Sequence, residues 1–346
     1  MSEPLVELDE LSVHFRVAGG NGSLFGSRLL PAVSGVSLNI GAGERVGLVG
    51  ESGSGKSTLG QAMLGLVKAS GGRVRIDGLE VTSGERETLA RLRRQTAMIF
   101  QDPYGSLNPV QRVGDALDEV LRVQRRLPSA ERAERVRSLL EQVGLPASFA
   151  RRRPRELSGG QCQRVGIARA LAVEPRLIVA DECVAALDVS IQGQIINLLL
   201  SLSESTGVTL LFIAHDLAVV RRLCERVAIL YLGRIVEEGP VADVFDAPRH
   251  PYTQALIGAI PRITPDGSLA HAVVSGEPPS PLALPVGCAF HPRCPHAATR
   301  CRQAPEPELR EDGARRWRCI LPPGALAPGG STVPIELDGS GARAPT

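Results

Sequence analysis

The sequence predicts an α/β fold: a sheet with both parallel and antiparallel strands, covered by helices and interrupted by a helical insertion. Short apolar runs at 45–49, 177–180 and 209–214 are separated by long stretches in which apolar residues recur at helical spacing. Unbroken apolar runs of this kind are typical of parallel strands that are buried on both faces. Two earlier stretches, 6–15 and 32–40, instead alternate apolar and polar residues, as half-buried antiparallel strands do.

The insertion is expected between the first and second of these apolar runs. From 110 to 143, leucines and valines recur at helical spacing among many arginines and glutamates, and no strand pattern interrupts them. We therefore expect a helical subdomain over about 102–173.

The main domain is expected to span 5–260. Residues 227–236 have the pattern of two strands around a turn at Gly233. Helical patterns then resume near Val241 and again near Thr253, after which the core-forming pattern stops.

A small C-terminal domain is expected over 261–325, followed by a flexible tail at 326–346. Residues 261–286 are rich in proline, glycine and serine, which is typical of a linker or a wrapped loop. The tail is similarly poor in residues that build a core.

Composition narrows the class of protein. The 346 residues are enough for two units, or for one unit with an appendix. The 39 basic and 37 acidic residues nearly balance, so no bulk positive field argues for a nucleic-acid partner. No apolar run approaches the roughly 20 residues that span a bilayer, and the first residues lack the features of a secretion signal. We therefore expect a cytosolic chain whose seven cysteines do not form disulfides.

Residues 50–57 match the phosphate-binding loop of nucleotide-binding proteins. The loop directly follows the apolar run 45–49 and precedes a helical pattern, which is the context that this motif requires. Its glycines allow the backbone N–H groups to point at phosphate oxygens, and Lys56 is expected to reach the β- and γ-phosphates. The Ser57 hydroxyl suits Mg²⁺. The expected ATP contacts are Gly50, Ser52, Gly53, Gly55, Lys56, Ser57 and Thr58.

A second anion site is expected where Ser158, Gly159, Gly160 and Gln161 begin another helical run. Glycines at a helix N-terminus again permit close approach of a phosphate. One chain would then carry two phosphate-binding surfaces.

Three further strands end in residues suited to phosphoryl transfer. The run 177–180 is followed by Asp181, which suits Mg²⁺, and Glu182, which suits the attacking water. Gln101 ends a strand at 96–100, where its amide could contact both the metal and the water. His215 closes the strand at 209–214. Taken singly, these residues have plainer interpretations. Ser158 could cap a helix, Asp181 and Glu182 could be a solvated strand end, and His215 could be structural.

Together, these motifs in this order and spacing closely resemble the ABC ATPase family over about 5–260. The resemblance implies that two such domains sandwich two ATP molecules, each held by the phosphate loop of one and the 157–161 signature of the other. Glu182 would then polarise water, His215 would contact the γ-phosphate, and Asp188 would lie at the dimer seam. Mg²⁺ would be held by Ser57, Gln101 and Asp181. Phe15 resembles the aromatic that stacks on adenine, although an ordinary core position is an alternative.

The chain departs from the family after Glu182, where Cys183 stands in place of the usual proline. The loss of the ring leaves a looser turn. Because Lys56, Asp181, Glu182 and His215 all remain, we expect hydrolysis to persist. An ATP-binding regulator without turnover is the alternative.

Segments 250–256 and 287–294 resemble the tail of the oligopeptide and dipeptide importer ATPases, and 102–109 and 158–164 also resemble that subfamily. The resemblance implies import of peptides, nickel or similar solutes, at the cytoplasmic face of the cell membrane. It also implies as partners a second ATPase subunit, identical or paralogous, two transmembrane permeases and an extracytoplasmic solute-binding protein.

Four cysteines gather in the C-terminal region with five, six and seventeen residues between them: Cys288, Cys294, Cys301 and Cys319. This spacing is unlike the paired Cys-x₂-Cys of a zinc ribbon. Four thiolates in a proline-rich, core-poor segment suit a [4Fe–4S] cluster, and members of the resembled subfamily are thought to carry one. Zinc and unliganded thiols are the alternatives, with His291 and His296 as substitute ligands. The other three cysteines, Cys162, Cys183 and Cys224, are interpreted as packing residues.

A rival function is that of a soluble ABC ATPase acting on nucleic acid or ribosomes. Such proteins commonly carry two cassettes in one chain, long coiled-coil insertions or basic tracts, whereas this chain has one cassette and near-neutral charge.

Overall fold

The computed structural model describes residues 3–18, 27–260, 276–324 and 326, and the backbone alone of 262–263 and 269–270. The chain divides into two compact units, Met1–Arg234 and Ile235–Thr346. This division falls inside the predicted main domain of 5–260, so the bounds given by the sequence stay a prediction. Part of the predicted linker at 261–286 and nearly all of the predicted tail at 326–346 lie outside the described residues.

The first unit contains an antiparallel sheet in the order β2-β1-β4-β5. Its strands are β1 (Val6–Ala18), β2 (Ser27–Ile40), β4 (Gly71–Ile76) and β5 (Leu79–Glu80). Val6 pairs with both Ile40 and Ile76, and all three side chains are buried. The alternating pattern of the sequence therefore correctly predicted these antiparallel strands, which form a sheet of their own.

The parallel strands of the first unit lie in the order β9-β3-β8-β7-β6. They are β3 (Arg45–Val49), β6 (Thr96–Ile99), β7 (Leu177–Asp181), β8 (Thr209–Ala214) and β9 (Arg226–Tyr231). Every residue of β7 and β8 is buried, as the unbroken apolar runs predicted. Parallel and antiparallel strands are thus both present, which confirms the predicted α/β fold.

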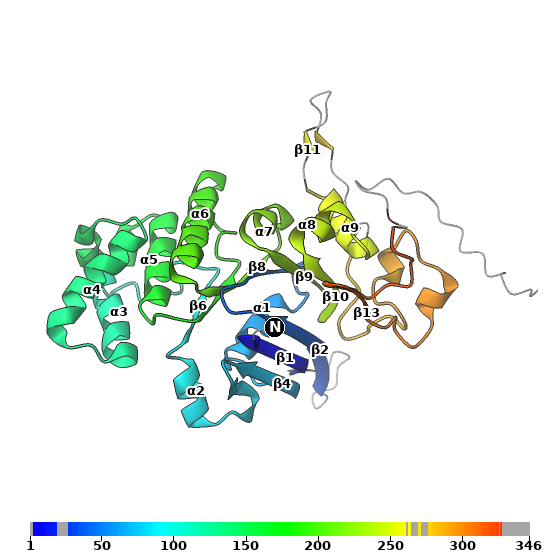
Figure 1. Cartoon of the computed structure of the whole chain (residues 1–346), viewed down its shortest axis with the longest axis horizontal. Coiled ribbons are helices and arrows are strands. Elements are labelled where there is room, and N and C mark those ends of the chain that lie inside the picture. The colour runs from blue at the N-terminus through cyan, green and yellow to red at the C-terminus, as the bar shows by residue number, and fades with distance from the viewer. Residues whose placement is uncertain are drawn as a thin grey trace, which may run out of the picture. The chain divides into compact units, whose positions relative to one another are not determined.

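Helices cover both faces of the parallel strands (Figure 1). On one face α1 (Lys56–Met63) contacts β1 and β8, and Gly60 lies so close to the sheet that a Cβ would be 2.9 Å from Ile213. On the other face α7 (Leu217–Leu223) contacts β3, where a Cβ on Gly47 would be 2.4 Å from Val220. Helix α6 (Val189–Thr206) packs against α7.

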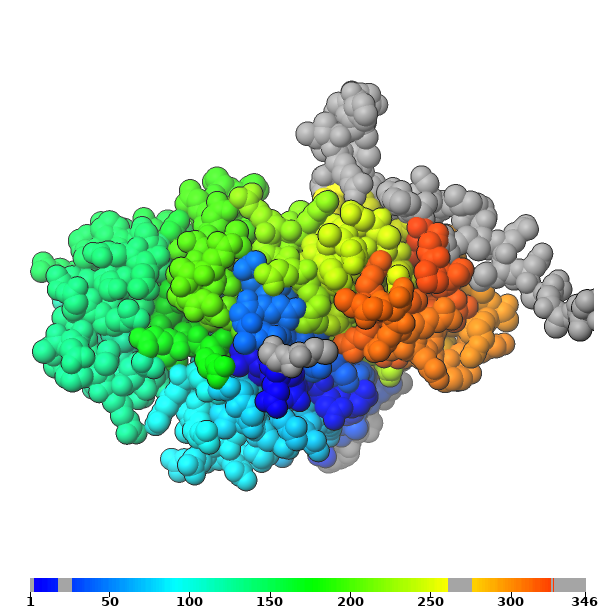
Figure 2. Space-filling model, viewed as in Figure 1, coloured from blue at the N-terminus to red at the C-terminus, as the bar shows by residue number. Residues whose placement is uncertain are grey.

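The predicted helical stretch is confirmed between β6 and β7. It comprises α3 (Val113–Val120), the π-helical turn η2 (Leu121–Arg125), α4 (Ser129–Gln142), the 3₁₀ turns η3 (Ala147–Arg151) and η4 (Pro154–Glu156), and α5 (Gly159–Leu171). Helix α3 contacts α4 and α5, and the three lie together at one end of the first unit (Figures 1 and 2). The first unit also contains η1 (Val81–Ser83) and α2 (Arg86–Leu92).

The second unit is built around a short antiparallel sheet in the order β13-β14-β10. Strand β10 (Arg234–Pro240) pairs with β14 (Arg315–Trp317), which pairs with β13 (Arg310–Asp312). Helices α8 (Val241–Asp246) and α9 (Pro251–Gly258) follow β10, as their patterns predicted. The turns η5 (His291–Arg293) and η6 (Thr299–Arg302) and the strand pair β11 (Arg262–Ile263) and β12 (Leu269–Ala270) complete it.

A buried carboxylate joins the parts of this second unit. Glu237 is fully buried and accepts hydrogen bonds from the backbone N–H groups of Arg249 and His250 and from the Arg315 guanidinium, at 2.7–2.9 Å. Burial raises the pKa of Glu237, and these donors oppose the shift. A buried charge requires such partners, so the bonds of Glu237 hold β10, α9 and β14 together.

Candidate functional site

The loop 50–55 follows strand β3 and contains two glycines, Gly55 and Gly50, at which a side chain would clash with the backbone of another strand. Gly55 has φ +102°, and a Cβ there would lie 2.1 Å from the Ala32 carbonyl oxygen. A Cβ on Gly50 would lie 2.2 Å from the Leu230 carbonyl oxygen. Gly53 has φ +76°, which favours glycine, but a side chain there would meet no clash, because nothing lies within 4 Å of its Cβ position. Helix α1 begins at Lys56, directly after this loop, so the free N–H groups of the helix start and of the loop are adjacent.

Lys56 lies inside this loop and is 4% exposed. Its ammonium donates to the carbonyl oxygens of Gly50 at 2.8 Å and Glu51 at 3.0 Å, and lies 3.5 Å from the Glu182 carboxylate. Burial lowers the pKa of Lys56, and the carboxylates of Glu182, Asp181 and Glu51 oppose that shift. The loop thus holds a buried cation where an incoming phosphate would meet it.

Ser57 and Asp181 form a pair of hard oxygen donors. The Ser57 hydroxyl, in the first turn of α1, donates to the Asp181 carboxylate at the end of β7 at 2.9 Å. Burial raises the pKa of Asp181, and the bond from Ser57 opposes the shift. A hydroxyl and a carboxylate are oxygen ligands of the kind that Mg²⁺ takes, so the donor chemistry of this pair fits the metal.

Glu182 lies between Lys56 and His215. Its backbone has φ +42°, which is uncommon for a residue with a side chain, and its N–H donates to the Ile213 carbonyl oxygen at 3.0 Å. The second carboxylate oxygen lies 3.8 Å from Nδ1 of His215. Glu182, His215 and Gln192 line a cavity of about 30 Å³, which is large enough for a water molecule. Strained backbone of this kind is found at functional sites.

Gln101 and Phe15 lie at exposed positions of the same unit. Gln101 follows β6, whose last residue pairs with Ala180 of β7, so it lies at the same sheet edge as Asp181. Its side chain is exposed. Phe15 on β1 is 38% exposed, which does not agree with the alternative of an ordinary core position.

The signature residues begin α5. Ser158 caps this helix: its hydroxyl accepts from the Gln161 N–H at 3.4 Å, and the Gln161 side chain accepts from the Ser158 N–H at 3.0 Å. Ser158 is exposed, and Gly159, Gly160 and Gln161 are half-buried. A Cβ on Gly160 would lie 2.5 Å from Ile191, so a side chain there has no room.

Asp188 and Cys183 flank the turn between β7 and α6. Asp188 is exposed, and its carbonyl oxygen accepts the N–H groups of Ile191 and Gln192 at the start of α6. Cys183 is 1% exposed, and burial raises the pKa of its thiol to about 12. Cys162 and Cys224 are buried as well, in agreement with the packing role predicted for all three.

The four C-terminal cysteines line one cavity of the second unit, together with His250 and Phe290. Cys288 donates its backbone N–H to the Cys301 carbonyl oxygen at 2.9 Å. Burial raises the thiol pKa of Cys288 to about 11, and that of Cys294 and of Cys319 to about 12. Across the described residues, no three His, Cys, Asp or Glu side chains form a group that could hold a metal ion. This arrangement gives no support to zinc or to an iron–sulfur cluster.

Two features of the ATP site are not visible in the sequence. The Lys56–Glu182 contact joins residues from two different strand ends, and only the fold brings them together. Ser54 is 3% exposed, and its hydroxyl has no hydrogen-bond partner among the described residues. The position of Ser54 inside the phosphate loop was the one signal that could have identified it.

Comparison with known proteins gives two family matches. Residues 33–185 match the model of the ABC transporter family, and 236–301 match the model described as oligopeptide/dipeptide transporter, C-terminal region. A putative peptide import ATP-binding protein of Brucella abortus is 48% identical over 320 residues, which cover 92% of this chain and 94% of that one. A protein of Brucella ovis with the same description is 46% identical over 89% of this chain and 94% of that one.

Solved structures give the same result for the fold. A dimeric ATP-binding cassette in a post-hydrolysis state, bound to ADP and phosphate, matches 68% of this chain and 98% of its own, at 33% identity and a TM-score of 0.61. A protein of Clostridium perfringens, described as part of an ABC transporter complex, matches 70% of this chain and 91% of its own, at 29% identity and a TM-score of 0.60. In the described part of this chain, no helix combines the length and the apolar composition needed to cross a membrane.

Proposed function

This chain belongs to the ABC transporter family of ATP-binding proteins, and on that premise we propose that it is the ATP-hydrolysing subunit of a peptide importer. The observation that carries the proposal is the meeting of five side chains at the carboxyl ends of neighbouring parallel strands. They are Lys56, Ser57, Asp181, Glu182 and His215. Ligand sites of α/β proteins are found at this edge of the sheet.

Each of these side chains has one task in the proposed reaction. Lys56 exchanges its bonds to the Gly50 and Glu51 carbonyls for bonds to the β- and γ-phosphates. Glu182 orients the attacking water and accepts its hydrogen bond, and His215 donates to the γ-phosphate. Ser57 and Asp181, with Gln101, would hold Mg²⁺, which would offset the charge that builds up on the phosphates. The adenine would stack on Phe15, which is exposed enough to accept it.

Hydrolysis is proposed to require two copies of the ATPase fold. Ser158 and the half-buried residues 159–161 face outward from the start of α5, where the γ-phosphate bound to a partner subunit can reach the helix N-terminus. Asp188, exposed at the start of α6, is then placed at the seam between the two subunits. The second subunit would be an identical copy or a paralogue.

The proposed setting is the cytoplasmic face of the cell membrane. Because the relatives in Brucella are described as peptide import ATP-binding proteins, we assign peptides as the solute and import as the direction. Two transmembrane permeases and an extracytoplasmic solute-binding protein complete the complex, and the chain itself is held there by the permeases. The alternative of a cassette acting on nucleic acid or ribosomes has no support from the charge, which is near zero.

The proposal is tested with the complex reconstituted in vesicles, by measuring ATP hydrolysis and peptide uptake together. The Glu182→Gln variant should lose both, because the group that polarises water is gone, while still binding ATP. Glu204→Gln, on the exposed face of α6, is the matched control and should retain both activities. Hydrolysis by Glu182→Gln at the parent's rate would refute the assigned mechanism, and hydrolysis without peptide uptake would refute the assigned solute.

We further propose that the cysteine cavity holds a [4Fe–4S] cluster. The proposal rests on donor chemistry alone: four thiols and the apolar ring of Phe290 line one cavity, and iron–sulfur clusters are held by four cysteines. Such a cluster would cross-link the segments 288–301 and 319 in a region with few other core residues, and would supply one-electron chemistry there. The residues that would hold it are Cys288, Cys294, Cys301 and Cys319.

Protein purified without oxygen tests the cluster. Four irons and four sulfides per chain, with broad absorbance near 400 nm, are expected in the parent and in Cys224→Ser, and are expected to be lost in Cys294→Ser. Parent protein without stoichiometric iron would refute the cluster.

A further inference from the structure

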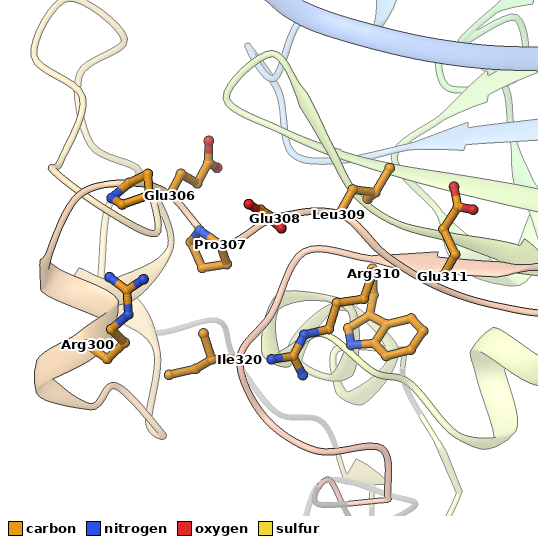
Figure 3. Close-up of a pocket in the computed structure, with 10 residues that line it drawn as sticks. Arg300, Glu306, Pro307, Glu308, Leu309, Arg310, Glu311 and Ile320 are labelled. Carbon is orange, nitrogen blue, oxygen red and sulfur yellow. The ribbon is translucent and has the colours of Figure 1, made fainter.

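The second unit contains an open pocket of about 760 Å³, whose wall includes Arg300, Glu306 and Glu308 (Figure 3). Trp317 also borders this pocket, but its indole nitrogen is fully buried and has no hydrogen-bond partner among the described residues. A ligand in the pocket would therefore not reach the indole N–H. Arg300 and Glu308 are exposed, and because exposed charges are solvated and contribute little, no ligand is assigned to this pocket.

In the first unit, the segment 102–109 after β6 resembles the importer subfamily but has no task in the proposed reaction. It begins with a compact loop. The Asp102 carboxylate accepts the Tyr104 N–H at 2.9 Å, and the Asp102 carbonyl oxygen accepts the Ser106 N–H at 3.2 Å. The Arg169 guanidinium, from the last turn of α5, donates to the Ser106 carbonyl oxygen at 2.5 Å. The loop is therefore attached to the helix that begins with the signature.

Tyr104 attaches the same loop to the start of α5. Its hydroxyl donates to the Leu157 carbonyl oxygen at 3.0 Å, and its ring lies 3.9 Å from the position of a Cβ on Gly159. The hydrogen bonds of the helix itself begin one residue later, where the Ser158 carbonyl oxygen accepts the Cys162 N–H at 2.9 Å. The Leu157 carbonyl thus lies outside the helical ladder, and the Tyr104 hydroxyl provides its partner.

The peptide group between Leu157 and Ser158 is held at both ends by side chains. Tyr104 binds its C=O, and the Gln161 side-chain oxygen accepts its N–H at 3.0 Å. Because a peptide group is planar, these two bonds fix the orientation of the plane and of the Ser158 Cα attached to it. The Ser158 hydroxyl accepts the Gln161 N–H. That bond uses an oxygen lone pair and leaves the hydroxyl hydrogen able to donate to a phosphate.

We propose that Tyr104 is a positioning residue for the signature: through the Leu157 carbonyl it orients the Ser158 hydroxyl toward the γ-phosphate bound by the partner subunit. Tyr104 itself does not touch ATP. The inference rests on the proposed function, because only a reaction between two subunits gives Ser158 a phosphate to contact. The loop that carries Tyr104 directly follows Gln101, so one segment of the chain serves its own ATP site and the partner's.

Amide hydrogen exchange of the full-length chain tests the attachment without ATP. Tyr104→Phe keeps the ring and loses the donor, so peptides that cover 157–162 should exchange about three- to tenfold faster than in the parent. Ser106→Ala is the matched control, because it removes another hydroxyl-to-carbonyl bond of the same loop, from Ser106 to Pro103 at 3.0 Å. It should leave this exchange unchanged. Unchanged exchange in Tyr104→Phe, or equal acceleration in both variants, would overturn the proposal.

Steady-state hydrolysis by the assembled complex tests the consequence. Tyr104→Phe should lower kcat about three- to tenfold. The isolated variant should bind ATP as tightly as the parent, because its phosphate loop is unchanged. Ser106→Ala should keep the parent kcat within about twofold.

A double-mutant cycle separates positioning from a general loosening of the fold. If Tyr104 acts through Ser158, Tyr104→Phe should cause no further fall in kcat once Ser158→Ala is present. Two falls that multiply would show that the residues act independently and would overturn the proposal. A parent complex that hydrolyses ATP, with a Tyr104→Phe complex that matches it, would overturn this inference alone. A parent complex without hydrolysis would refute the proposed function, and this inference with it.

Discussion

The phosphate loop allows a sharp prediction from two glycines that differ in their surroundings. Gly53 and Gly55 both have positive φ, but a Cβ on Gly53 meets nothing within 4 Å, whereas one on Gly55 lies 2.1 Å from the Ala32 carbonyl oxygen. Gly53→Ala should therefore lower the free energy of unfolding by about 1–2 kcal/mol, through its strained backbone conformation alone. Gly55→Ala should carry a similar conformational cost and, in addition, about 1–3 kcal/mol for the displaced backbone of β2.

The expected difference between the two variants is thus about 1–3 kcal/mol in the free energy of unfolding. At about 2–4 °C per kcal/mol for a unit of this size, the Tm of Gly55→Ala should lie about 2–12 °C below that of Gly53→Ala. Thermal unfolding followed by circular dichroism measures this, and binding of a fluorescent ATP analogue should fall more in Gly55→Ala, because the loop must move. Equal Tm values for the two variants would refute the close approach of Gly55 to Ala32.

Three further predictions follow from other sites. The pKa of His250 is lowered to about 3, first by burial and then by Arg318, so its neutral ring stabilises the second unit above its ordinary pKa of 6.5, and that stability is lost as pH falls. Between pH 7 and 5 the free energy of unfolding, measured with urea, should fall by about 2 kcal/mol. His250→Asn keeps an acceptor for the Tyr252 N–H and should not show this fall. The same pH dependence in parent and variant would contradict the burial of the ring. Ser158→Ala should lower the free energy of unfolding by about 1 kcal/mol, because the helix cap is lost. It should also slow hydrolysis in the assembled complex, while the isolated chain still binds ATP. Unchanged hydrolysis would exclude the signature from the reaction. Cys183→Ala should leave steady-state hydrolysis within about twofold, because the buried thiol touches neither water nor phosphate and the small cavity costs only about 1 kcal/mol; a loss comparable to that of Glu182→Gln would show that the thiol takes part.

The local parts of the fold were predictable from the sequence because their causes are local. The unbroken apolar runs of β7 and β8 and the alternation of β1 record burial on two faces or one. Glycines at 50–55 followed by Lys56 specify a loop and a helix start within eight residues. Gly55 has positive φ there, as that loop requires.

The contacts between distant segments were not predictable in the same way. The approach of Lys56 to Glu182 depends on the order β3-β8-β7, which no local pattern determines. The division of the chain after Arg234 falls within a stretch whose pattern predicts only two strands and a turn. From the sequence we therefore predicted the boundary at 260, before the segment where proline and glycine accumulate. The unused indole N–H of Trp317 is likewise a property of packing: a single tryptophan near the C-terminus reads as an ordinary core residue until its neighbours are known.

The central claim is that this chain works as the ATPase of a membrane importer, and its partners test that claim most directly. The tagged chain is extracted from membranes in mild detergent, and the proteins present in stoichiometric amount are identified by mass spectrometry. The account predicts two permeases with several membrane spans each, with or without a second ATPase subunit. Recovery of the chain alone, or with nucleic acid or ribosomes, would contradict it.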